Sequence, residues 1–271
     1  MHIVTVVTES QYYFPYLMDS CKKNGQELTI LGYGEKWLGF NWRLTKMINF
    51  LKQLPEHDIV CVVDGYDVIC TRHLNELEDE FIKIKNRTNC KLIVSKEILY
   101  GFNSVIGYFF FGKCKQENLN AGTYIATAGD MLNIITKVYN LNPKDNADDQ
   151  VLLTKYCNSS EDIYIDTHNE IFLSISHSLT DLYQYVEHKN GLFYYNNNAP
   201  FFVHAPGSGI LDTMVEKLGY GKCKIKKQLK LNIFNKKTLH FMFHPITLGY
   251  FVSFCFVLFL LFNFRRFLRT R

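Results

Sequence analysis

The chain has 271 residues, of which 47% are hydrophobic and 15% aromatic. This composition excludes an intrinsically disordered protein and predicts one main domain with a substantial core. The formal net charge of +4 is small for this length and the basic residues gather near the C-terminus, so the charge pattern argues against nucleic acid as the main partner.

Strand and helix patterns alternate through the first half of the chain. The predicted strands are residues 3–7, 27–33 and 59–63, and the predicted helices are residues 12–23 and 42–54. Asn24-Gly25 is a stop signal for the first helix, and the second ends before Pro55. The run 59–63 is wholly apolar, as in a strand buried on both faces. The alternation predicts an α/β domain with a parallel sheet covered by helices.

The second half is less regular. Its predicted helices are residues 74–85, 131–139 and 149–156, and its predicted strands are residues 91–95, 163–166 and 201–204. We expect the domain to cover residues 1–221 and a lysine-rich connector to cover residues 222–245.

Residues 246–264 form an uncharged, largely apolar run of 19 residues. As a helix rising about 1.5 Å per residue, it reaches roughly 28 Å, close to the hydrocarbon thickness of a bilayer. A buried core helix is the alternative, but the basic tail 265–271 follows at once and nothing remains to cover such a helix. The pattern predicts a single-pass membrane protein with a C-terminal anchor.

Loop charges leave the orientation of this anchor undecided, because lysines precede the span and arginines follow it. The first ten residues lack a basic leader and resemble a strand more than a signal peptide, which favours the cytosolic side for the domain.

Eight cysteines occur without a CxxC pair, which argues against a structural zinc site. An even count by itself does not establish disulfides. Cys61 and Cys70 flank a predicted buried strand and its exit, where a free thiol packs as a small apolar side chain.

An acidic turn, Asp64-Gly65-Tyr66-Asp67, follows the apolar strand 59–63. Ligands bind at the C-terminal ends of strands in open α/β sheets, and two carboxylates there form a hard-oxygen site for Mn²⁺ or Mg²⁺. A polar turn capped by its own aspartates is the alternative.

Three further positions are candidates for the same chemistry. Gly122 ends the segment Leu119-Asn120-Ala121-Gly122, before residues 123–126, where a glycine lets the backbone approach a ligand closely. Asp148 and Asp149 open a predicted helix, and complementing the helix dipole is their structural explanation. His204 ends a predicted strand, either as a metal ligand or as an ordinary hydrogen-bonded histidine.

Six ordered segments are similar to one family. They are Thr5-Val6-Val7-Thr8-Glu9, Leu31-Gly32-Tyr33-Gly34-Glu35-Lys36-Trp37, Val63-Asp64-Gly65-Tyr66-Asp67-Val68-Ile69, Leu119-Asn120-Ala121-Gly122, Asp148-Asp149-Gln150 and Val203-His204. In this order they resemble the glycosyltransferase domain of multifunctional procollagen lysyl hydroxylases and their procollagen glycosyltransferase relatives. The resemblance covers residues 3–209. It implies a nucleotide-binding, type A-like (Rossmann-like) glycosyltransferase fold that uses Mn²⁺ and a UDP-sugar.

The resemblance also implies roles for individual residues. Asp64, Asp67 and His204 match the metal ligands, and Asp148 and Asp149 match an acidic pair at the reacting sugar and the acceptor hydroxyl. The implied donor-binding residues are Thr8, Trp37 and Tyr66 at the uridine and ribose, Lys46 near the donor, Asn120 at the donor sugar, and Gly207 in the segment after the last metal ligand. The implied donor is UDP-glucose or UDP-galactose, and the implied acceptor is a protein or glycan hydroxyl, such as hydroxylysine or galactosyl-hydroxylysine.

The chain departs from the family at two segments near the implied pocket. Ile98-Leu99-Tyr100-Gly101 stands where the family has an aromatic and proline gate, and Ala205-Pro206-Gly207 stands where it has Gly-Asn-Gly. These differences leave a second hypothesis open, a membrane-tethered module that binds a UDP-sugar without turning it over.

Overall fold

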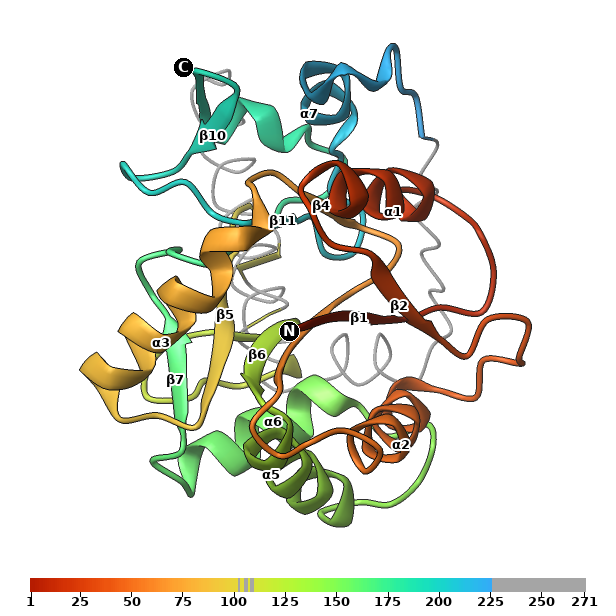
Figure 1. Cartoon of the computed structure of the whole chain (residues 1–271), viewed down its shortest axis with the longest axis vertical. Helices are drawn as coiled ribbons and strands as arrows, with labels where there is room; N and C mark the ends of the chain where they lie inside the picture. Colours follow the sequence, from red (N-terminus) through yellow and green to blue (C-terminus); the bar gives the residue numbers. More distant parts are fainter. Residues whose placement is uncertain (102, 105–106, 108–109, 226–271) are drawn as a thin grey trace, which may run out of the picture. The chain divides into compact units, whose positions relative to one another are not determined.

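The computed structural model describes residues 1–101, 103, 104, 107 and 110–225 (Figure 1). The predicted membrane helix 246–264, the tail 265–271 and most of the connector 222–245 lie outside these residues. Within the described part of the chain, no helix is long and apolar enough to cross a membrane.

A mixed sheet forms the centre of the described region. Its nine strands there are β1 (His2–Val6), β2 (Leu28–Leu31), β3 (Ile59–Val63), β4 (Val68–Cys70), β5 (Leu92–Leu99), β6 (Leu119–Thr127), β7 (Ile163–Asp166), β8 (Phe172–Ser176) and β11 (Phe202–His204). They are ordered β2-β1-β3-β6-β5-β8-β11-β4, with β7 also paired to β5. A separate hairpin joins β9 (Glu187–Lys189) and β10 (Leu192–Tyr194). The predicted α/β class is therefore confirmed.

The prediction of a parallel sheet was wrong in part. β6 runs antiparallel to both β3 and β5, and β4 runs antiparallel to β11. β6 is the next strand after β5 in the chain and pairs with it as an antiparallel neighbour, an arrangement that needs no crossover connection. The remaining neighbours, such as β1 with β2 and β3, are parallel as expected.

Helices cover both faces of the sheet. The helical elements are α1 (Phe14–Lys23), α2 (Phe40–Leu51), the 3₁₀ turn η1 (Leu74–Glu76), α3 (Leu77–Thr88), α5 (Ala128–Asn140), α6 (Asp149–Asn158), the 3₁₀ turn η2 (Leu182–Tyr185), α7 (Asp212–Val215) and the π-helical turn η3 (Glu216–Tyr220). α2, α5 and α6 pack together on one face (Figure 1). α1 and α3 pack on the other face.

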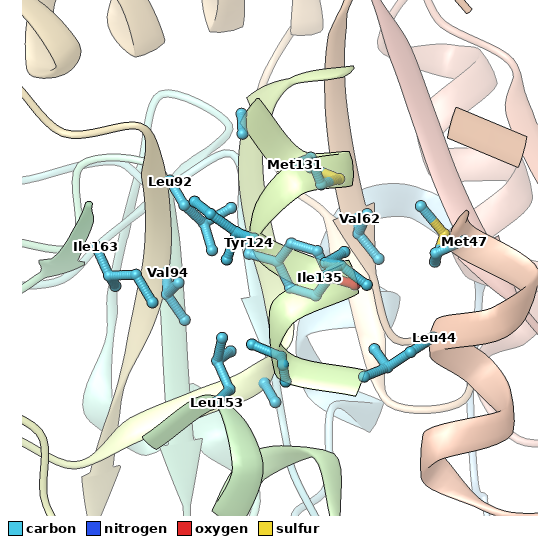
Figure 2. Close-up of a cluster of buried hydrophobic side chains, with 14 of the residues drawn as sticks. Leu44, Met47, Val62, Leu92, Val94, Tyr124, Met131, Ile135, Leu153 and Ile163 are labelled. Carbon is cyan, nitrogen blue, oxygen red and sulfur yellow. The ribbon is translucent and has the colours of Figure 1, made fainter. Parts of the chain in front are cut away.

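The core follows from the alternation of side chains along the central strands. In β3, Val60 and Val62 point to the face covered by α2, α5 and α6, whereas Cys61 and Val63 point to the face covered by α1 and α3. Figure 2 shows the first cluster, with side chains from α2, β3, β6 and α5 meeting around Tyr124. Burial on both faces explains why β3 is an unbroken apolar run.

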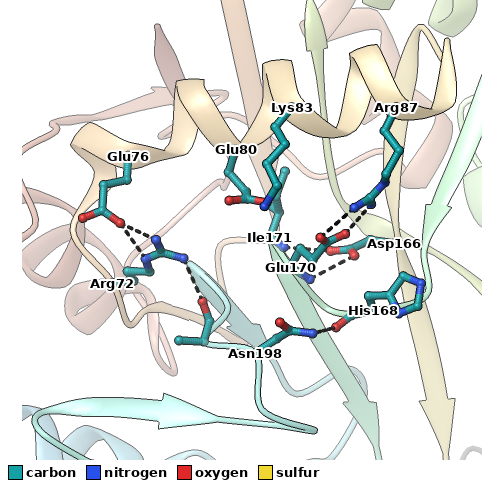
Figure 3. A network of polar contacts seen from close by, with 11 residues as sticks. Arg72, Glu76, Glu80, Lys83, Arg87, Asp166, His168, Glu170, Ile171 and Asn198 are labelled. Atoms are coloured by element: carbon teal, nitrogen blue, oxygen red, sulfur yellow. Dashed lines mark hydrogen bonds and ion pairs between the residues drawn. The ribbon is translucent and has the colours of Figure 1, made fainter.

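A disulfide and a set of hydrogen bonds, both buried, hold segments between the regular elements in place. A disulfide joins Cys114 to Cys157 of α6, with Cα atoms 5.8 Å apart. Cys61 and Cys70 are free and buried, as predicted. Around the turn after β7, Asp166 accepts backbone hydrogen bonds from Glu170 and Ile171 at 3.0 and 2.9 Å (Figure 3).

Candidate functional site

Strand pairing brings the acidic turn to the distant histidine. Asp64 directly follows β3, and Asp67 directly precedes β4. β11 pairs antiparallel with β4 so that His204 lies opposite Val68. The backbone N–H after His204 also donates to the carbonyl of Asp67 at 2.8 Å. The register between two short strands therefore sets the imidazole beside the carboxylates.

The three side chains form one cluster. One ligand atom from each of Asp64, Asp67 and His204 lies within 4.8 Å of the others. His204 Nε2 is 3.2 Å from Asp67 Oδ1 and 3.7 Å from Asp64 Oδ2. This nitrogen is buried and makes no well-aligned hydrogen bond within the described residues. On the opposite side of the ring, His204 Nδ1 is 3.3 Å from the Ser174 hydroxyl, a contact that fixes the orientation of the imidazole.

Burial and charge act against each other in this cluster. Burial raises the pKa of Asp64, although Arg43 and His204 oppose that shift. Burial disfavours the charged form of His204, but Asp67 and then Asp64 outweigh it and raise the pKa of the imidazole. Two carboxylates so close together are stabilised when a cation lies between them.

Gly122 on β6 leaves the space that a cation and its ligands need. A Cβ atom at this position would lie 2.5 Å from both Asp64 Oδ2 and His204 Cε1. The backbone N–H of Gly122 donates to Asn120 Oδ1 at 2.8 Å, so the predicted donor-sugar residue lies at the same edge of the cluster. Two carboxylates, one imidazole and a side-chain-free neighbour fit a divalent cation, as the sequence predicts.

Arg43 of α2 is the residue that sequence analysis missed. Its side chain is 8% exposed, and its guanidinium pairs with both Asp64 and Asp149. Nε donates to Asp149 Oδ2 at 3.1 Å, and Nη2 donates to the same oxygen and to the carbonyl of Ala121 at 3.2 Å. A charged residue within the apolar stripe of a helix was the available signal, since Leu44 and Met47 on the same helix are buried.

Asp148 and Asp149, the acidic pair at the start of α6, lie in different environments. Asp148 caps the helix, with Oδ1 accepting the N–H of Val151 at 3.2 Å, which confirms the predicted helix start. The side chain of Asp149 is 7% exposed and faces Arg43. Burial raises the pKa of Asp149 to about 6, against the opposing effect of Arg43. Asp149 is thus joined to the metal-ligand cluster through one guanidinium.

Thr8 and Tyr66, both predicted at the uridine and ribose, lie together. The backbone N–H of Thr8 donates to Tyr66 Oη at 3.0 Å. Gly34 N–H donates to the carbonyl of Thr8 at 2.8 Å. This hydrogen bond joins the loop after β2 to Thr8. Trp37 lies on that loop, and its ring is 5.4 Å from the ring of Trp42.

Lys46 contacts Glu35 and Trp42, and Gly207 lies in an open turn. Lys46 pairs with Glu35, and its Nζ lies 5.2 Å above the ring of Trp42. Gly207 has φ +71, and a Cβ there would meet no atom within 4 Å. Their predicted roles at the donor stay predictions.

The chain matches a known family and one curated protein. A family model described as the PLOD GT domain matches residues 1–220. Human procollagen-lysine,2-oxoglutarate 5-dioxygenase 2 is 24% identical over 234 residues, covering 83% of this chain and 27% of the human protein. The chain thus spans about a quarter of the length of that curated relative.

Solved structures of glycosyltransferases are also similar. A glycosyltransferase involved in glycosylation of the major capsid of PBCV-1 has 14% identity and a TM-score of 0.46, covering 77% of this chain and 96% of that chain. The galactosyltransferase LgtC, in complex with donor and acceptor sugar analogues, has 12% identity and a TM-score of 0.42, covering 76% of this chain and 87% of that chain.

Proposed function

Because this chain belongs to the family of PLOD GT domains, we propose that it transfers a hexose, glucose or galactose, from a UDP-sugar to an acceptor hydroxyl. We infer a type A-like glycosyltransferase fold from membership of this family. Hydroxylysine or galactosyl-hydroxylysine in a collagen-like protein is the proposed acceptor, and Mn²⁺ is the proposed cation.

One observation carries this proposal. Asp64 and Asp67 come from the first third of the chain and His204 from its last third, yet their ligand atoms lie within 4.8 Å. A turn capped by its own aspartates does not require a distant imidazole. The convergence therefore favours a cation site over the structural explanation of the acidic turn.

The residues of the site have separate tasks in the proposed reaction. Asp64, Asp67 and His204 would hold a divalent cation, which would supply positive charge to the diphosphate of the donor as the sugar leaves. Asn120 lies beside this cluster at the place proposed for the donor sugar. Asp148 and Asp149 orient the acceptor hydroxyl or accept its proton.

Release of UDP from UDP-glucose and UDP-galactose tests the proposal, with Mn²⁺ and with or without a hydroxylysine peptide. We expect the double substitution Asp64→Ala and Asp67→Ala to lower the rate at least about 100-fold, because the ligands for the cation are gone. The matched control is Glu78→Ala with Asp79→Ala, which removes two exposed carboxylates from α3. Equal rates in the wild type and the site variant contradict the proposal.

A second candidate function is a UDP-sugar-binding module without turnover. The hydrogen bonds of Asp149 favour this function. Two Arg43 donors occupy its Oδ2, which limits the use of Asp149 as a base. Calorimetry separates the two functions. A binding module takes up UDP with Mn²⁺ and releases no UDP from any donor sugar.

Attachment to a membrane through residues 246–264 is also a proposal. The lysine and arginine balance leaves its side open, and a disulfide is typical of oxidising compartments. The Cys114–Cys157 pair supports the lumenal side over the predicted cytosolic side. Protease protection of the full chain in sealed membranes, followed by thiol labelling of the protected domain, distinguishes the two orientations.

A further inference from the structure

Arg43 lies between the two halves of the proposed site. Its guanidinium contacts a metal-ligand carboxylate, Asp64, on one side and the buried member of the acidic pair, Asp149, on the other. The third anchor is the carbonyl of Ala121 at 3.2 Å, on β6. One planar group from α2 therefore spans β3, β6 and the start of α6.

The two oxygens of Asp64 are divided between this guanidinium and the cation cluster. Arg43 Nη1 donates to Oδ1, whereas Oδ2 lies 3.7 Å from His204 Nε2. A carboxylate held through one oxygen presents the other in a fixed direction. Arg43 thus aims Asp64 Oδ2 at the position between His204 and Asp67.

Asp149 holds Arg43 in the position from which it orients Asp64. Two donors of the guanidinium, Nε and Nη2, converge on Asp149 Oδ2. Both side chains are buried, with exposed fractions of 8% for Arg43 and 7% for Asp149. A lysine cannot reproduce this arrangement, because its ammonium lacks the planar fork that reaches two carboxylates at once.

We propose that Arg43 is a positioning residue that couples cation affinity at Asp64 to the placement of Asp149. The inference rests on the proposed function. It assigns to Asp149 an effect on cation binding, although Asp149 does not belong to the ligand cluster. Partners that orient metal-binding carboxylates typically change metal affinity about 10–100-fold when they are replaced.

Mn²⁺ binding, measured by calorimetry and by the electron paramagnetic resonance signal of the free ion, tests the inference without reliance on turnover. We expect Arg43→Lys to weaken Mn²⁺ binding about 10–100-fold, since the charge is kept and the fork is lost. We expect Asp149→Asn to weaken it in the same direction, because Arg43 loses its anchor. Asp148→Asn removes an equal charge one residue away while asparagine keeps the helix cap, and should leave the affinity within about twofold of the wild type.

The outcomes separate this inference from the proposed function. A wild-type chain that binds no Mn²⁺ refutes the proposed function. If the wild type, Arg43→Lys and Asp149→Asn all bind Mn²⁺ with equal affinity, only the proposed role of Arg43 is overturned. Thermal unfolding without metal monitors folding of each variant, and if Arg43→Lys does not fold, the comparison of Asp149→Asn with Asp148→Asn decides. Equal effects of those two substitutions also overturn the inference, because charge alone then explains them.

Discussion

His204 Nε2 lies 3.2 Å from Asp67 Oδ1, a contact created by the pairing of β11 with β4. Neither strand is longer than three residues, so the contact depends on the sheet that holds them. β8 supports β11 from the other side through a parallel register, with His204 opposite Ser174. The candidate cation site is thus a property of the assembled sheet and not of a local motif.

Replacing Gly122 by alanine should damage cation binding more than folding. The added Cβ would lie 2.5 Å from Asp64 Oδ2 and from His204 Cε1, so both ligands must move. We expect Mn²⁺ affinity to fall at least about tenfold, as measured by calorimetry. Crowding in a packed region costs about 1–3 kcal/mol of unfolding free energy, which denaturant titration measures separately.

The control for that prediction is Gly129→Ala on α5, where the nearest atom to the new Cβ is Glu56 Cβ at 3.1 Å. Mn²⁺ affinity in this variant should match the wild type. Gly122→Ala protein with unchanged Mn²⁺ affinity shows that the cation does not occupy the space beside β6.

The Cys114–Cys157 disulfide should stabilise the domain. It links cysteines separated by 43 residues in the sequence, and closing a loop of that length in the unfolded chain is worth about 4 kcal/mol in the chain-entropy model. We expect the double substitution Cys114→Ser and Cys157→Ser to lower the free energy of unfolding by about that amount, measured by urea titration.

Reducing agent provides the matched control for the disulfide. It should lower the unfolding midpoint of the wild type and leave that of the double variant unchanged. Equal midpoints of oxidised and reduced wild type indicate that the two thiols are not joined in the folded protein.

The ion pair between Arg87 and Glu170 should make stability depend on pH. Arg87 donates to both carboxylate oxygens of Glu170, at 3.0 and 2.6 Å (Figure 3). Hydrogen bonding to Arg87 lowers the pKa of Glu170. The stabilisation is therefore fully present above the ordinary glutamate pKa of about 4.3. It is lost as the pH falls through the lower pKa of the folded state.

Arg87→Ala should consequently reduce the free energy of unfolding by about 1 kcal/mol at neutral pH. The difference from the wild type should shrink as the solution is acidified below about pH 4. Urea titrations across this range measure it. Lys83→Ala, which breaks an exposed pair with Glu80 on the same helix, should cost less at neutral pH. If Arg87→Ala lowers the free energy of unfolding by the same amount at every pH, the loss comes from packing and not from the ion pair.

Regular elements could be predicted where apolar spacing was strong. β3 was predicted with its observed bounds, and the predicted helix over residues 149–156 matches α6 (Asp149–Asn158). β6 was not predicted as a strand, because Asn120, Gly122 and Thr123 interrupt its apolar pattern. These residues are buried in the structure. They are not apolar, because this strand carries part of the candidate site.

Long-range arrangement could not be obtained from local patterns. The antiparallel direction of β6 depends on whether the chain pairs it with β5 as a consecutive strand or after a crossover, and no residue within the strand specifies that. Arg43 is a similar case. Helical spacing identifies its face of α2 as buried, but its carboxylate partners become evident only when Asp64 and Asp149 are seen to share one end of the sheet.

Tyr66 offers a test of the proposed uridine position. Its ring is half-buried, and its hydroxyl accepts the N–H of Thr8 at 3.0 Å. If uracil stacks on the ring, Tyr66→Ala should weaken UDP binding about tenfold or more, since stacking on an aromatic side chain is worth about 1–3 kcal/mol. Tyr66→Phe keeps the ring and should change the affinity about threefold or less.

Calorimetric titration with UDP in the presence of Mn²⁺ measures both Tyr66 variants. The control is Tyr139→Ala, which truncates another half-buried tyrosine on α5 and should leave UDP binding unchanged. A larger loss in Tyr66→Phe than threefold assigns the effect to the hydroxyl, because only its contacts with Thr8 and Glu9 are then removed. Unchanged binding in Tyr66→Ala places the base elsewhere, and Trp37, with 39% of its surface exposed, becomes the position to substitute next.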